Sequence, residues 1–105
     1  PTPWPCFVLA VRDEFITNEK ETLKVILKVI NSITAGFKHI PKIDTIISER
    51  YRQKNEDVKN WLALTEWSQQ NIQAITVEAV QDQLLKLDII SKKIPFEQLV
   101  TNLDD

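Results

Sequence analysis

Residues 5–11 read Pro-Cys-Phe-Val-Leu-Ala-Val, and the charged run Arg12-Asp13-Glu14 follows them directly. The apolar stretch is of strand length, and its lack of alternation is typical of a strand that is buried on both faces. The rest of the chain has helical periodicity, so it offers this strand no visible partner. Because a lone strand leaves its backbone N–H and C=O groups unpaired, the sequence predicts the carboxy-terminal part of a larger α/β domain, or a strand that pairs with a second copy.

The composition is that of one globular domain or less. The chain has 105 residues and a net charge of −2, from 13 basic and 15 acidic side chains, and this balance favours neither nucleic acid nor an anionic membrane as a partner. Its one glycine, Gly36, excludes the glycine-rich loops that bind phosphates. We therefore expect a single partial domain over 1–105, with a connector and strand at 1–11, a helical region at 12–101 and a frayed tail at 102–105.

The longest helix is expected over Glu19–Lys38. Asn18 and Glu21 stand three residues apart, which resembles a capping box at its start. Gly36 and the proline that follows at position 41 predict its end. Apolar residues recur along one face at helical spacing, and burial of this stripe is expected to stabilise the fold. The stripe consists of Leu23, Ile26, Leu27, Ile30, Ile33 and Phe37, and Val25 and Val29 widen it.

Shorter helical patterns follow the long helix. We expect helices over Asp44–Gln53, from Asn55 onward and over Thr76–Asp88, with a last short turn after Pro95. Asp82 and Lys86 are expected to form an i,i+4 ion pair on the third of these helices. The predicted fold is therefore mainly α, with one apolar N-terminal strand followed by about four to five helices.

Candidate catalytic residues are few. Cys6 and His39 are the only cysteine and histidine in the chain. A thiol inside an apolar strand is usually an inert core residue, and a histidine at a helix end has an ordinary solvent-facing role. One cysteine and one histidine also cannot form a structural zinc site on their own. We expect no catalytic residue, no metal, no cofactor and no enzymatic activity.

The three tryptophans are the better candidates for a binding site. Trp61 lies in a helical stripe and is expected in the core. Trp4 precedes the strand, and Trp67 follows a stretch, 64–67, whose pattern fits a turn or an extended segment. Aromatic rings on such connections commonly line ligand clefts, so Trp4 and Trp67 are predicted to line a pocket.

Two stretches resemble a known family. They are Thr-Pro-Trp-Pro-Cys-Phe-Val at 2–8, together with Phe15-Ile16, and Trp-Leu-Ala-Leu-Thr-Glu-Trp-Ser at 61–68. The chain resembles, over about residues 2–100, the bacterial substrate-binding proteins of the type 2 periplasmic-binding fold. The nearest branch is the one that contains sulfonate, taurine and nitrate binders and thiamine-pyrimidine-synthesis proteins.

The resemblance implies a solute-binding component of an ABC transporter, with two α/β lobes that close on a small molecule. This chain would then be the return crossing and the carboxy-terminal helices, and most of the ligand site would lie outside it. The implied ligand-binding residues are Thr2, Trp4 and Trp67, since Thr2–Cys6 would lie near the hinge and cleft. The implied partners are a small solute and a membrane permease. The implied location is periplasmic or extracytoplasmic, and the residues do not exclude a cytoplasmic one.

Two other functions stay open at this stage. The first is a small helical interaction module that dimerises through the strand Cys6–Val11, and an isolated chain is expected to form that dimer because exposed strand edges recruit other strands. The second is a role in pyrimidine or cofactor synthesis, as in some relatives of the periplasmic-binding fold.

Overall fold

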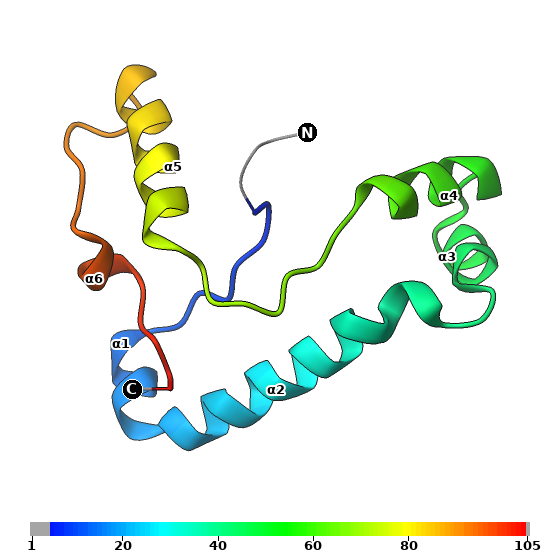
Figure 1. Cartoon of the computed structure of the whole chain (residues 1–105), viewed down its shortest axis with the longest axis horizontal. Coiled ribbons are helices and arrows are strands. Elements are labelled where there is room, and N and C mark those ends of the chain that lie inside the picture. The colour runs from blue at the N-terminus through cyan, green and yellow to red at the C-terminus, as the bar shows by residue number, and fades with distance from the viewer. Residues whose placement is uncertain (1–4, 105) are drawn as a thin grey trace. The chain divides into compact units, whose positions relative to one another are not determined.

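The computed structural model describes residues 5–104, and every regular element within them is a helix (Figure 1). The described chain divides into two compact units. One unit combines the chain up to Leu23 with the chain from Gln70 onward, and the other spans Lys24–Gln69. The elements are α1 (Asp13–Asn18), α2 (Lys20–Gly36), the short 3-10 helix η1 (Phe37–His39), α3 (Ile43–Tyr51), α4 (Asn55–Leu64), α5 (Ala74–Lys86) and α6 (Phe96–Leu99).

The predicted N-terminal strand is wrong, and with it the prediction of a segment from an α/β lobe. Residues 7–11 have no regular structure, and Phe7 and Leu9 are 94% and 49% exposed. A strand exists only where its backbone groups bond to a neighbouring strand, and no second strand occurs among residues 5–104. The apolar run therefore indicated strand propensity without the pairing that a strand requires. The observed fold is all-helical.

Helix α2 agrees with the prediction in position but not in burial. It begins at Lys20, and η1 continues it after Gly36, while Asn18 is the last residue of α1 and not a cap. Leu23 is the one buried residue of α2, with 3% of its surface exposed. Most of the predicted stripe is open to solvent, so α2 stabilises this chain less than its pattern suggests.

The remaining helices pack locally. In the second unit, α3 lies against α4 and η1 (Figure 1), and Val58 and Leu62 of α4 are the buried apolar residues. In the first unit, α5 lies against α6, and Val77 and Gln81 of α5 are buried. Helix α4 begins at the predicted Asn55, whereas α5 begins before Thr76, with Gln73 at its N-cap.

Helix α3 ends on a residue in the left-handed conformation. Arg52 has φ 52° and ψ 47°, and its backbone N–H donates to the carbonyl of Ser48. The next N–H, of Gln53, donates to the same carbonyl at 3.0 Å. Glycine usually occupies this position because a Cβ atom is unfavourable there. Arg52 therefore strains the backbone at the end of α3.

Replacing Arg52 with glycine is expected to raise the free energy of unfolding of the second unit by about 0.5–1 kcal/mol, because it removes the Cβ penalty of the left-handed conformation. The matched control is Arg50→Gly, which lies inside α3 and should lower stability by about 1 kcal/mol. Urea denaturation followed by circular dichroism measures both. If both variants changed the free energy of unfolding in the same direction, the assigned end of α3 would be contradicted.

Candidate functional site

Three aromatic rings meet in the second unit. The ring centroid of Trp67 lies 5.0 Å from that of Phe37 and 5.9 Å from that of Trp61, both in edge-to-face geometry. Such pairs stabilise by about 0.5–1.5 kcal/mol beyond their buried area. Trp61 was predicted to be a core residue, yet it is 48% exposed. The cluster joins η1, α4 and the irregular segment that follows α4.

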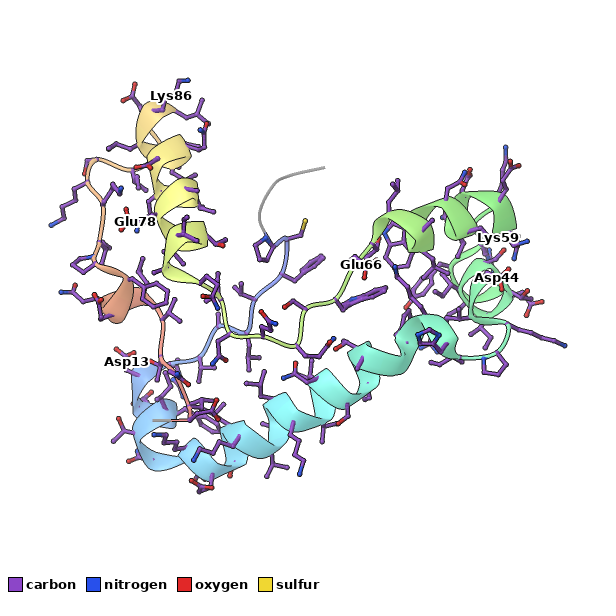
Figure 2. All side chains as sticks on the ribbon, in the orientation of Figure 1. Asp13, Asp44, Lys59, Glu66, Glu78 and Lys86 are labelled. Carbon is purple, nitrogen blue, oxygen red and sulfur yellow. The ribbon has the colours of Figure 1, made fainter. Side chains whose placement is uncertain are left out.

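Polar contacts fix the irregular segment 65–69 beside the C-terminal end of α2. The Nζ atom of Lys38 lies 2.8 Å from a carboxylate oxygen of Glu66, which is labelled in Figure 2. The amide of Gln69 donates to the hydroxyl of Thr34 at 3.2 Å and to the carbonyl of Trp67 at 2.7 Å. The stretch at 64–67, for which a turn and an extended segment were both considered, is the end of α4 followed by this fixed irregular segment.

The predicted ligand-binding residues are only partly within the described chain. Trp67 is half-buried and lines a hollow of about 170 Å³ between the end of α2 and segment 65–69. Thr2 and Trp4 lie outside the described residues. The side chains that line the hollow besides Trp67 are mostly polar, and they belong to Thr34, Ala35, Lys38, His39, Glu66 and Gln69.

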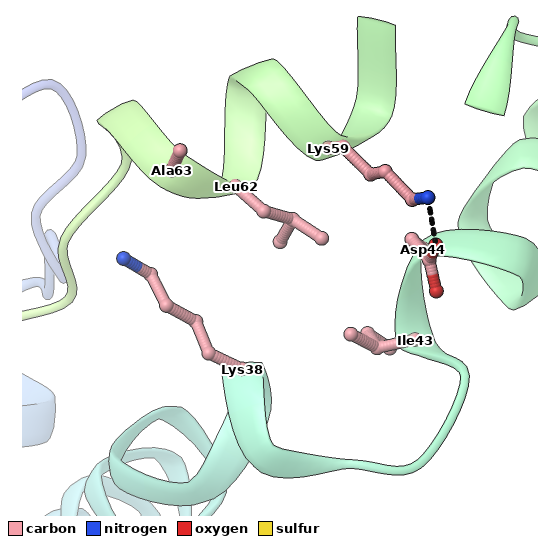
Figure 3. Close-up of a pocket in the computed structure, with 6 residues that line it drawn as sticks. All are labelled: Lys38, Ile43, Asp44, Lys59, Leu62 and Ala63. Carbon is pink, nitrogen blue, oxygen red and sulfur yellow. Dashed lines mark ion pairs between the residues drawn. The ribbon is translucent and has the colours of Figure 1, made fainter. Parts of the chain in front are cut away.

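A second hollow, of about 340 Å³, lies between α3 and α4 (Figure 3). Its walls are formed by Ile43, Leu62 and Ala63, with Lys38 and Lys59 at its rim. The Nζ atom of Lys59 lies 3.8 Å from a carboxylate oxygen of Asp44, and Lys38 pairs with a glutamate as described above. Each ammonium group therefore has a carboxylate close by. The positive charges at the rim of the hollow are balanced by these carboxylates.

The residues considered for catalysis, Cys6 and His39, lie in different units of the described chain. Cys6 was expected inside a buried strand, but it is exposed. His39 is exposed at the end of η1. No group of three potential metal-ligating side chains gathers within residues 5–104.

The least expected feature is an exposed apolar surface on α2. We call Val25, Ile26, Val29, Ile30 and Ile33 the α2 strip. Their exposed fractions lie between 39% and 61%, although the sequence predicted that they are buried. One signal pointed to this surface, because the apolar arc of the helix is wider than a single neighbour can cover. Leu23 is buried, whereas the five residues of the strip are exposed.

In the first unit, a cluster of three charged side chains joins the chain after α5 to that helix. The Nζ atom of Lys93 lies 2.5 Å from Glu78 and 2.7 Å from Asp82. Hydrogen bonds to Asp82 and then Glu78 raise the pKa of Lys93 above its ordinary value, so its ammonium form is favoured. Asp82 thus pairs with Lys93, whereas the sequence suggested Lys86. The cluster holds one positive and two negative side chains, and its contacts join the chain after α5 to that helix.

No family model, curated protein or solved structure matches this chain. The resemblance to solute-binding proteins of the periplasmic-binding fold therefore stays a prediction. Within residues 5–104, none of the helices combines the length and the apolar character that a membrane crossing requires.

Proposed function

We propose that this chain is a non-catalytic helical interaction module whose working surface is the α2 strip. The observation that carries the proposal is the exposure of five neighbouring branched apolar side chains on one helix. Complete burial of a valine or isoleucine side chain contributes about 1.5–3 kcal/mol, so covering five that are half-exposed would contribute roughly 4–7 kcal/mol before the costs of association. Exposed apolar patches are common at protein–protein interaction sites.

The chemistry of the strip favours a helical partner with an apolar face. Its residues carry no charge and no hydrogen-bonding side chain, so recognition depends on shape and burial. Val25, Val29 and Ile33 are four residues apart and form one ridge along α2. Ridges of this kind fit the grooves of another helix, and an amphipathic helix is a common partner for such a surface.

A synthetic amphipathic helix of about 20 residues, with leucine on one face and glutamate and lysine on the other, tests the proposal. We expect the fluorescein-labelled peptide to bind the chain in a fluorescence anisotropy titration. Val29→Glu should weaken binding at least about tenfold, because it places a charge in the apolar contact. The matched control is Ala35→Glu, which adds the same charge about 120° around α2 from Val29 and should leave the affinity unchanged. Equal binding by both variants, or no binding by the wild type, would contradict the proposal.

As a second proposal, this chain is part of the solute-binding component of a transporter. This proposal does not require a strand within residues 5–104. It is supported by the resemblance and by the position of Trp67 at the edge of a hollow. It would bring with it a permease as partner and an extracytoplasmic location. It predicts that residues 1–105 alone give no saturable change in tryptophan fluorescence with taurine or nitrate, because one wall of a cleft cannot enclose a ligand. Saturable binding by this chain alone would contradict the proposal that most of the ligand site lies outside residues 1–105.

A further inference from the structure

We draw no further inference here: the strongest candidate, the exposed apolar strip of α2, is the surface on which the proposed function already rests, and nothing in the structure shows what covers it.

Discussion

Replacing Leu62 with alanine is expected to lower the free energy of unfolding of the second unit by about 2–4 kcal/mol, because it leaves a cavity between α3 and α4. Leu62 is 9% exposed and is, with Val58, one of the buried apolar residues of this unit. A unit of fewer than 50 residues has little stability to lose, so the variant should be largely unfolded near body temperature. Fluorescence of Trp61 and Trp67 reports on this unit during urea denaturation.

The matched control is Leu64→Ala, at the last position of α4. Leu64 is 81% exposed, so the same substitution removes little buried surface and should change stability by less than about 0.5 kcal/mol. The pair isolates burial from the intrinsic preference of alanine for helices, since both changes are leucine to alanine. Equal losses at the two positions would show that α4 presents a different face to α3.

Local signals in the sequence predicted the helices well. Asn55 begins α4 as expected, and Pro95 precedes α6 at its N-cap, although neither N-cap residue makes a side-chain hydrogen bond to its helix. The same local reasoning failed at residues 7–11. Strand propensity is visible in the sequence, but a strand also needs a partner from elsewhere, and a single chain does not reveal whether one is supplied.

The candidate site was harder to predict than the helices. Periodicity showed that one broad face of α2 is apolar, and this is correct. It did not show which part of that face the chain itself covers, because coverage depends on contacts between distant segments such as Asn31 and Gln69, whose side-chain amide and backbone carbonyl lie 3.4 Å apart. Trp67 was singled out because it lies on a connection, and its two ring contacts depend on the same distant packing.

Gln81 is the second residue whose substitution should have a large effect. It is a buried polar side chain of α5, with 6% of its surface exposed. Its amide group donates to the carbonyl of Ile94 at 3.0 Å and accepts from the N–H of the same residue at 2.7 Å. This pair of bonds satisfies both backbone groups of Ile94, as a neighbouring strand would do. It therefore fixes the chain after α5 to the helix.

Gln81→Glu is expected to lower the free energy of unfolding of the first unit by about 2–4 kcal/mol at pH 7. The carboxylate still accepts from the N–H of Ile94, but it faces the carbonyl without a proton to donate. Burial, this carbonyl and the adjacent Asp82 should raise the pKa of the new carboxyl group in the folded state. A raised pKa in the folded state means that folding binds a proton, so stability relative to the wild type should recover as the pH falls. Gln83→Glu, on the exposed side of α5, is the matched control and should change stability little at either pH. A Gln81→Glu variant as stable as the wild type at pH 7, or one that gains nothing relative to it at pH 4–5, would show that this amide does not hold the chain.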